Sequence, residues 1–455
     1  MEPPASLQTR RSAVYSPTLR ADVSRPHMRR RRSPKTVAEI VERIVGPDLP
    51  IAVETYDGGR IGPGDAPATM VVRSPDALRR ILTAPGELGL GRAYVAGDLD
   101  VQGDIYAALV SLRERLPRVR LGPSQLVALA RLVGLDGLRP LPPPPEEARL
   151  RGRQHSKGRD AQAIAHHYDV SNRFYELVLG PSMTYSCAVW PRNDATLEEA
   201  QAAKYELICR KLDLREGMRL LDVGCGWGGM AMHAARLHRA SVVGVTLSRR
   251  QVEWAQKAVA DAGLADRVEI RLQDYRDVLD GPFDAISSIG MFEHVGLRNL
   301  GLYFRRLYRL LRPGGRLLNH GISRPARPGA RTRAGVPVTP PRFARRSFID
   351  RYVFPDGELH EVGAVISTMQ AAGLEVRHLE GLREHYALTL RAWVANLEAN
   401  WEEAVAEVGA ARARVWRLYM AASALNFEAG RTQVHQVLAV RADRGRSGFL
   451  LRPTF

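Results

Sequence analysis

The chain has 455 residues, of which 45% are hydrophobic, so it can hold two or three domains with apolar cores. Its 66 basic and 49 acidic residues give a net charge of +17, which suggests an anionic partner such as nucleic acid or an anionic lipid surface. Three scattered cysteines exclude a disulfide framework and a zinc cluster and fit a reduced cytoplasmic setting. No apolar run reaches the roughly 18 residues that span a bilayer, and none follows the N-terminal charges as in a secretory signal.

Much of the charge excess lies in residues 1–35, which contain nine basic and two acidic side chains. This arm has prolines and no hydrophobic periodicity, so we expect it to be disordered. Two interpretations stay open. The arm is either a solvated tail or misassigned start, or it binds a membrane surface, where each basic residue adds about 1 kcal/mol.

Residues 36–137 have the pattern of a small α+β domain. Ser74 and Pro75 predict a helix start, with serine as the N-cap and proline at the first helical position. The run 89–106 mixes glycines with aspartates, but its spacing matches no known metal loop, which favours caps and turns. A semi-rigid linker, proline-rich and then charged, is expected over 138–160, and a second domain over 161–455.

The second domain is organised around residues 219–232, RLLDVGCGWGGMAM, which read as a strand, a glycine turn and the start of a helix. Glycines allow a tight turn and a close approach of the backbone to a ligand. The next strand, 241–245, carries no carboxylate at its end, which argues against NAD. Asp222 instead stands just before the first glycine, as in S-adenosylmethionine (SAM) methyltransferases.

Strands and helices alternate after the glycine turn, with strands expected at 268–272, 283–289 and 316–320. This order predicts an α/β fold with a doubly wound, mostly parallel sheet of the Rossmann-like type, whose ligands lie at the carboxyl ends of the strands. A helical region over 383–425 with an apolar stripe is expected to pack in the core. A closing strand follows over 432–440.

Several polar residues stand at positions suited to a site. Glu293 follows an apolar run, where a carboxylate is costly unless it is hydrogen-bonded, and His320 ends a strand at the same sheet edge. His166 and His167 lack further ligands at a recognised spacing, so no metal is expected. The segment 164–190 suits a lid, and Cys187 is either a nucleophile or a small buried residue.

Six motifs in one order resemble the cyclopropane-fatty-acyl-phospholipid synthase family of SAM-dependent methyltransferases, which includes the mycolic acid cyclopropane synthases. They extend from about His166 to Leu390 and read HHYDVSNRFYELVLGPSMTYSCAVW, LLDVGCGWGG, GVTLSRRQ, IGMFEHVG, RPGGRLLNHGIS and LREHYALTL. The N-terminal domain also resembles that of the members that act on phospholipids.

The resemblance implies two sets of site residues. The SAM contacts fall on Tyr185, Ser186, Gly224, Gly226, Thr246, Leu247, Gln251 and Ile289, beside Asp222. A bound bicarbonate ion is expected among Cys187, Glu293, His320, Ile322 and Tyr386. The chain departs from some members at Ser423, where they carry a cysteine.

The implied reaction is methyl transfer from SAM to the double bond of unsaturated acyl chains of membrane phospholipids, giving cyclopropane rings. An aromatic cavity would stabilise the carbocation, and bicarbonate would accept a proton. The aromatic candidates are Tyr168, Phe174, Tyr185, Trp190 and Phe292.

Three alternatives stay open: a methylene- or methyl-branched product, a small soluble methyl acceptor, or a non-catalytic protein that binds membranes or nucleic acid. The favoured expectation is a cytoplasmic methyltransferase that binds peripherally at the inner face of the cell membrane. Its expected partners are unsaturated phospholipid and an anionic membrane surface, without nucleic acid, and it is a possible homo-oligomer.

Overall fold

The computed structural model describes residues 36–115 apart from position 47, residues 139–148, scattered positions between 152 and 162, and residues 170–326 and 347–455. The predicted arm, residues 1–35, lies outside the described residues. His166, His167 and Tyr168 also lie outside them. Residues 36–455 form one compact unit.

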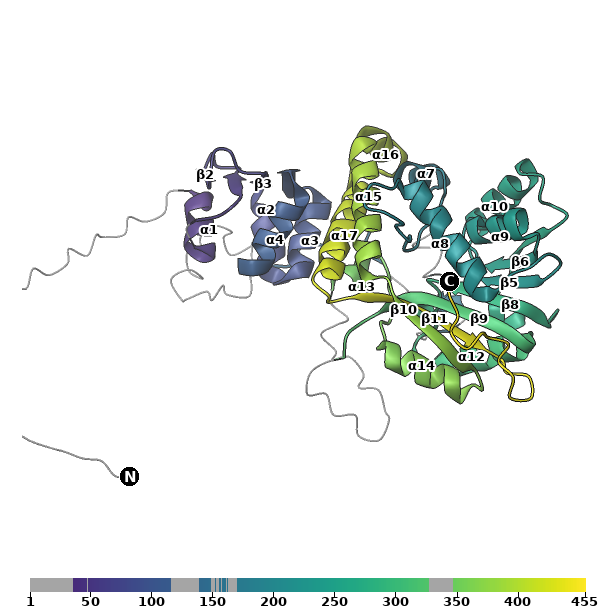
Figure 1. Ribbon diagram of the computed structural model, residues 1–455. Helices are drawn as coiled ribbons and strands as arrows, with labels where there is room; N and C mark the ends of the chain where they lie inside the picture. The colour runs from purple at the N-terminus through teal and green to yellow at the C-terminus, as the bar shows by residue number, and fades with distance from the viewer. Residues whose placement is uncertain are drawn as a thin grey trace, which may run out of the picture. The chain divides into compact units, whose positions relative to one another are not determined.

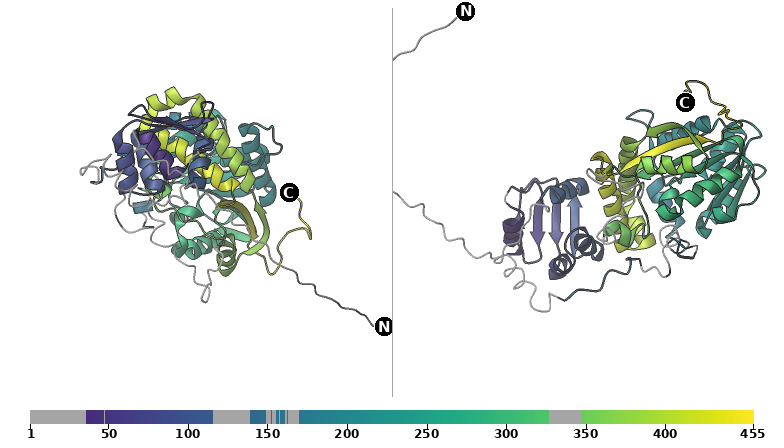
Figure 2. Two further views of the ribbon diagram at one scale, coloured as in Figure 1. Left: turned by 90° about the vertical axis from the view of Figure 1, so that its left-hand side faces the viewer. Right: turned by 90° about the horizontal axis from the view of Figure 1, so that it is seen from below.

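The N-terminal part of this unit contains a four-stranded sheet in the order β2-β1-β3-β4, with helices packed beside it (Figure 2). The side chain of Ser74 accepts a hydrogen bond from the Asp76 amide at the start of α2, as predicted. In the run 89–106, Gly97 caps the end of α3 in the left-handed conformation, and the Asp104 carboxylate accepts a hydrogen bond of 2.8 Å from the Tyr106 amide at the start of α4, as the caps-and-turns interpretation expects. The rest of the run forms most of α3 and all of β4. The elements are α1 (Val37–Val45), β1 (Ala52–Thr55), β2 (Arg60–Ile61), β3 (Ala68–Val72), α2 (Pro75–Thr83), α3 (Glu87–Ala96), β4 (Leu99–Gly103) and α4 (Ile105–Arg115).

The described part of the proline-rich segment, residues 139–148, is hydrogen-bonded both to α3 and to the region around Arg351. The buried carboxylate of Glu147 accepts two hydrogen bonds of 2.9 Å from Arg92 of α3. The backbone amide of Ala148 donates to the carbonyl of Arg351 at 2.7 Å. This segment therefore packs against the fold, whereas the division of the chain into domains at 138–160 stays a prediction.

The central sheet has seven strands in the order β10-β11-β9-β8-β5-β6-β7. Strands β5 to β9 are parallel, and β11 runs antiparallel to both β9 and β10. This confirms the doubly wound, mostly parallel sheet. The strands are β5 (Arg219–Val223), β6 (Ser241–Thr246), β7 (Val268–Leu272), β8 (Phe283–Ile289), β9 (Leu311–Ser323), β10 (Glu375–Gly381) and β11 (Gln433–Val440).

Helices cover both faces of the sheet (Figure 1). Successive residues of a strand point to opposite faces, so Leu220 packs with α8, α9 and α10, while Leu221 packs with α12 and α14. The two apolar layers bury the sheet from both sides, as a parallel sheet requires. The helices are α8 (Leu197–Leu212), α9 (Gly229–His238), α10 (Arg249–Asp261), α12 (Leu297–Leu310) and α14 (Val362–Ala371).

The C-terminal helical region forms three helices rather than one. It breaks at Asn400 and at Gly409, whose φ of +80° suits glycine. Trp393 of the predicted apolar stripe is fully buried, which confirms core packing there. These helices, with α7, make an aromatic layer next to the sheet, and no helix among the described residues is long and apolar enough to cross a membrane. The helices are α7 (Asn172–Leu179), α15 (Arg383–Ala399), α16 (Trp401–Val408) and α17 (Ala410–Glu428).

Candidate active site

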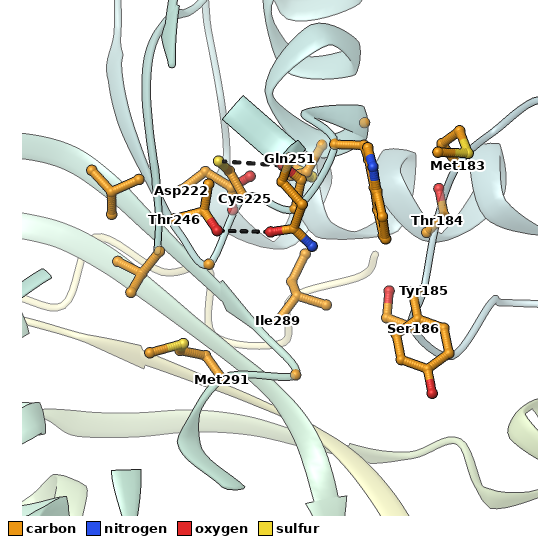
Figure 3. A pocket seen from close by; sticks show the side chains of 18 of the residues that line it. Met183, Thr184, Tyr185, Ser186, Asp222, Cys225, Thr246, Gln251, Ile289 and Met291 are labelled. Atoms are coloured by element: carbon orange, nitrogen blue, oxygen red, sulfur yellow. Dashed lines mark hydrogen bonds between the residues drawn. The ribbon is translucent and has the colours of Figure 1, made fainter. Parts of the chain in front are cut away.

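A pocket of about 110 Å³ lies at the carboxyl ends of β5, β6 and β8, where the strand order reverses. Such a switch point is the usual ligand site of an open α/β sheet. Figure 3 shows Tyr185 and Ser186 on one side of this glycine-turn pocket and Asp222 and Thr246 on the other. The structure brings every predicted cofactor residue to its wall: Tyr185, Ser186, Asp222, Gly224, Gly226, Thr246, Leu247, Gln251 and Ile289.

The glycine turn has the backbone that its sequence predicts. Gly224 and Gly226 have φ values of +77° and +55°, which side chains with a Cβ rarely adopt. The amides of Gly224 and Cys225 donate to the carbonyl of Val245 at 2.9 and 3.1 Å. The turn is therefore tied to β6, and its backbone forms part of the pocket wall.

Asp222 is buried at the end of β5 and accepts a hydrogen bond of 2.7 Å from the Ser287 hydroxyl. Burial raises its pKa to about 6.

Lys204 of α8 is also fully buried, and its Nζ donates to the Ser186 hydroxyl at 2.8 Å. Burial lowers the pKa of Lys204 to about 7. Gln201 donates to the Ser186 carbonyl at 3.0 Å, so α8 holds the Tyr185–Ser186 wall from behind.

Gln251 lies in the first turn of α10, which Ser248 caps by accepting a hydrogen bond from the Gln251 amide. The Thr246 hydroxyl donates to Gln251 Oε1 at 2.7 Å. This bond turns the amide nitrogen of Gln251 away from Thr246 (Figure 3). Gln251 thus offers donors close to the end of β6, the strand end that carries a carboxylate in a dinucleotide-binding sheet.

A second cavity of about 260 Å³ adjoins the glycine-turn pocket, and Tyr185, Ser186, Gly290 and His294 line both. Its remaining wall is largely aromatic and aliphatic. The structure places all the predicted catalytic residues there: Cys187, Glu293, His320, Ile322 and Tyr386.

Glu293 stands in α11 (Phe292–Val295), the short helix after β8, and is 7% exposed. The backbone amide of Ile322 donates to Glu293 Oε1 at 2.6 Å. Glu293 Oε2 is buried and has no hydrogen-bond partner among the described residues. Burial raises the Glu293 pKa to about 7, so protonated and ionised forms coexist near neutral pH.

His320 of β9 is 2% exposed, and its Nδ1 lies 3.1 Å from Nε2 of Gln436. Its Nε2 is buried without a hydrogen-bond partner among the described residues. Burial, with a smaller effect of the buried lysines Lys204 and Lys211, lowers the His320 pKa well below its usual value. The imidazole is therefore neutral.

Cys187 is a buried thiol whose Sγ donates to the Ala188 carbonyl at 3.2 Å. Burial raises its pKa, so the thiol is neutral and is not an activated nucleophile. The ring of Tyr386 lies 4.7 Å from that of Phe427. Cys187 therefore contributes a small contact to the cavity, and Tyr386 contributes an aromatic part of its wall.

The aromatic prediction is only partly right for the described residues. Tyr185 lines both cavities and stacks on Trp393 with ring centroids 5.1 Å apart. Phe174, Trp190 and Phe292 do not line the second cavity, because Phe174 packs inside the helical layer, Trp190 bonds Thr389 and Phe292 lies against Gly321. Aromatic residues that the sequence did not single out take their place: Phe354, Tyr419 and Phe427.

A cluster of possible metal ligands lies elsewhere, between α8 and α9. Ligand atoms of Cys209, His233 and His238 come within 4.8 Å of one another. The carboxylate of Glu206 pairs with both imidazoles, at 3.3 and 3.0 Å. Residue spacing did not reveal this cluster because its members lie on two different helices. The pairing with Glu206 accounts for the closeness of the two histidines without a metal.

Known proteins with similar sequence and structure cover most of the chain. A family model described as mycolic acid cyclopropane synthetase matches residues 155–437. A probable fatty acid methyltransferase of Mycobacterium tuberculosis is 49% identical over 430 residues, which are 92% of this chain and 98% of the relative. The cyclopropane-fatty-acyl-phospholipid synthase of Escherichia coli is 36% identical over 382 residues, which are 83% of this chain and 89% of that enzyme.

Among solved structures, mycolic acid cyclopropane synthase CmaA1 complexed with SAH and CTAB matches with 37% identity and a TM-score of 0.57. The match covers 62% of this chain and 98% of that protein. The chain therefore belongs to the mycolic acid cyclopropane synthetase family and is a SAM-dependent methyltransferase.

Proposed function

We propose that the protein transfers a methyl group from SAM to the double bond of unsaturated acyl chains of membrane phospholipids and closes a cyclopropane ring. The observation that carries the proposal is the pair of unpartnered buried atoms, Glu293 Oε2 and His320 Nε2, in the wall of a largely apolar cavity next to the SAM pocket. A buried polar atom without a partner calls for an explanation, and two such atoms in the wall of one cavity support a bound polar ligand there. A small anion such as bicarbonate fits this donor set.

The apolar cavity suits an acyl chain and the chemistry that it must undergo. An isolated alkene is a weak nucleophile, so it must lie in line with the sulfonium methyl group of SAM. Tyr185 and Ser186 line both cavities and would position the two reactants at their junction. Methyl transfer leaves a carbocation on the acyl chain, which the aromatic rings of Tyr185, Tyr386 and Tyr419 in the cavity wall would stabilise while the apolar lining limits access of water.

The polar end of the cavity suits removal of a proton. Cys187, Glu293, His320, Ile322 and Tyr386 would hold bicarbonate, which would supply a proton acceptor when bound. Glu293 Oε2 donates a hydrogen bond when protonated and accepts a proton when ionised, and a pKa near 7 allows both. His320 stays neutral and holds the anion without competing for the proton.

The way in which the cation loses its proton decides the product. Direct loss from the newly added methyl group closes the cyclopropane ring. A hydride shift that moves the cation to the methyl-bearing carbon, followed by loss of a methyl proton, gives a methylene branch, and loss from a neighbouring chain carbon gives a methyl-branched unsaturated chain. The name of the M. tuberculosis relative, a probable fatty acid methyltransferase, keeps these branched products as the alternative. A small soluble acceptor is disfavoured because the cavity wall is mainly apolar.

The charge of the chain supports action at a membrane. A net charge of +17 favours an anionic lipid surface, and we place the enzyme as a peripheral protein at the inner face of the cell membrane. Nucleic acid is not an expected partner. A homo-oligomer stays a prediction.

The test is incubation of purified protein with SAM, bicarbonate and liposomes of monounsaturated phospholipid, followed by mass analysis of the acyl chains. A gain of one CH₂ unit is expected, and no gain with any lipid composition would overturn the proposal. Mild hydrogenation then separates the products, because a methylene group takes up two hydrogens and a cyclopropane ring does not. Repeating the reaction in carbonate-free buffer tests the anion, and undiminished turnover there would remove bicarbonate from the mechanism.

A further inference from the structure

A row of polar side chains crosses three neighbouring strands beside the second cavity. Glu380 of β10 pairs in register with Gln436 of β11, and Gln436 pairs in register with His320 of β9. Directly opposed residues of paired strands point to the same face of a sheet. The row therefore runs along the face covered by α8 and ends at a residue of the proposed anion site.

Lys211 of α8, the helix that covers this face of the sheet, contacts two residues of the row. It is fully buried, and its Nζ donates to Gln436 Oε1 at 2.7 Å and pairs with the Glu380 carboxylate. An ammonium group has only donors, so the oxygen of the Gln436 amide must face Lys211. The Gln436 amide nitrogen then faces His320 Nδ1, at 3.1 Å.

The orientation of one amide thus determines which ring nitrogen of His320 carries the proton. The Gln436 nitrogen can only donate, so His320 Nδ1 must accept. A neutral imidazole that accepts at Nδ1 carries its hydrogen on Nε2. Nε2 is the atom of His320 that is buried without a partner among the described residues.

We propose that Gln436, oriented by Lys211, is a positioning residue that holds His320 in the tautomer with hydrogen on Nε2, so that the ring presents a donor to the anion site. This inference rests on the proposed function, in which the second cavity holds an anion. The opposite tautomer would present a lone pair to that anion and repel it. The selection acts through His320, since neither Gln436 nor Lys211 lines the cavity.

The energetics of the row support a specific role over mere packing. Burying a lysine costs several kcal/mol unless it is paired, and apolar residues of similar size often stabilise such positions better. Gln436 and Lys211 are both fully buried, with Leu438 and Leu318 of the same core nearby. The presence of a polar pair among these apolar side chains supports a role for the hydrogen-bond direction that it imposes on His320.

The first test reads the tautomer directly. ¹⁵N NMR of the full-length protein labelled at histidine, with His320→Asn to assign its signals, is expected to show His320 with hydrogen on Nε2 alone. A wild-type His320 with hydrogen on Nδ1, or charged at neutral pH, would overturn the inference. This reading needs no turnover, so it stands apart from the proposed function.

The second test removes the constraint. Gln436→Met keeps the side-chain volume and is expected to give a mixture of the two tautomers and to raise the bicarbonate concentration for half-maximal turnover roughly tenfold, the effect of one lost hydrogen bond. SAM affinity should not change. Lys211→Met should shift the tautomer ratio in the same direction and add little to that shift in the Gln436→Met background, because Lys211 selects the tautomer through Gln436.

His435→Gln is the matched control, because His435 is the neighbour of Gln436 on β11 and bonds Ser323 instead. Burial lowers the pKa of His435, so His435 is uncharged at neutral pH, and the variant should leave the tautomer and the bicarbonate dependence unchanged there. A single tautomer in Gln436→Met would overturn the inference even if that variant lost turnover. Wild-type turnover without any bicarbonate dependence, together with the expected tautomer, would refute the proposed anion and leave the tautomer assignment standing.

Discussion

At the scale of single residues, Glu293 combines burial, one hydrogen bond from Ile322 and one unpartnered oxygen. Glu293→Gln preserves the shape of the side chain and the bond from Ile322, but it cannot exchange a proton. We expect turnover to fall by roughly 10² to 10⁴, the usual contribution of acid–base catalysis, while SAM binding is kept because Glu293 does not line that pocket. Acyl-chain masses and calorimetric SAM binding measure the two effects.

Glu206→Gln serves as the control for this substitution, since Glu206 is a carboxylate of α8 that lines neither cavity. Its turnover should match that of the unmodified protein. If Glu293→Gln also turned over normally, Glu293 would have no part in moving the proton.

The same carboxyl group makes stability depend on pH. Its pKa is about 7 in the folded protein and 4.5 ordinarily, so between these values the folded state keeps a proton that the unfolded state has lost. The free energy of unfolding should therefore fall as pH rises from about 4.5 to about 7. Glu293→Gln removes this loss, and its stability relative to the parent should be greater at pH 8 than at pH 5 by about 2 to 3 kcal/mol. Denaturant unfolding at both pH values checks this, and an equal difference at both would contradict the raised pKa.

At the scale of elements, the packing of α11 against β9 depends on the missing side chain of Gly321. A Cβ there would lie 2.0 Å from the Phe292 ring and 3.1 Å from Glu293 Oε1. Gly321→Ala must therefore displace α11, and we expect a loss of about 1 to 3 kcal/mol of stability with a strong loss of turnover. Thermal unfolding and the liposome assay measure these effects.

Gly363→Ala is the matched control, because a Cβ at Gly363 of α14 meets no atom within 4 Å. It should be neutral or slightly stabilising, since alanine favours a helix more than glycine does. Equal stability and turnover of the two variants would show that the packing of α11 against β9 does not depend on the missing side chain of Gly321.

At the scale of the whole molecule, we propose that the basic arm adds membrane affinity and takes no part in catalysis. Deleting residues 1–35 removes a net charge of seven. We expect weaker sedimentation with anionic liposomes at low salt, with the difference shrinking as salt screens the charges. Turnover on detergent-dispersed substrate should be unchanged. Equal sedimentation with and without the arm at every salt concentration would leave the arm no role in membrane binding.

Most of the architecture was predictable because its signals are local. The strand and glycine turn around Asp222 and the cap at Ser74 depend on residues close together in the chain. Prediction failed where a local signal had two outcomes. The strand expected at 316–320 begins earlier, because β9 starts directly after α12 and includes the Pro313-Gly314-Gly315 run. Strand β10 was not predicted, because its residues lie at the sheet edge and show little apolar alternation.

The sequence by itself determined the sheet type and the residues at the strand ends, because a parallel α/β sheet always brings those ends together. Only the tertiary structure decided which distant side chains support them. Lys204 and Lys211 lie in a helix whose pattern does not reveal their burial, and Gln436 is one polar residue in a closing strand. The contacts of these residues with Ser186 and His320 span long stretches of chain. Such hydrogen bonds depend on packing and register in three dimensions, which leave no short-range pattern in the sequence.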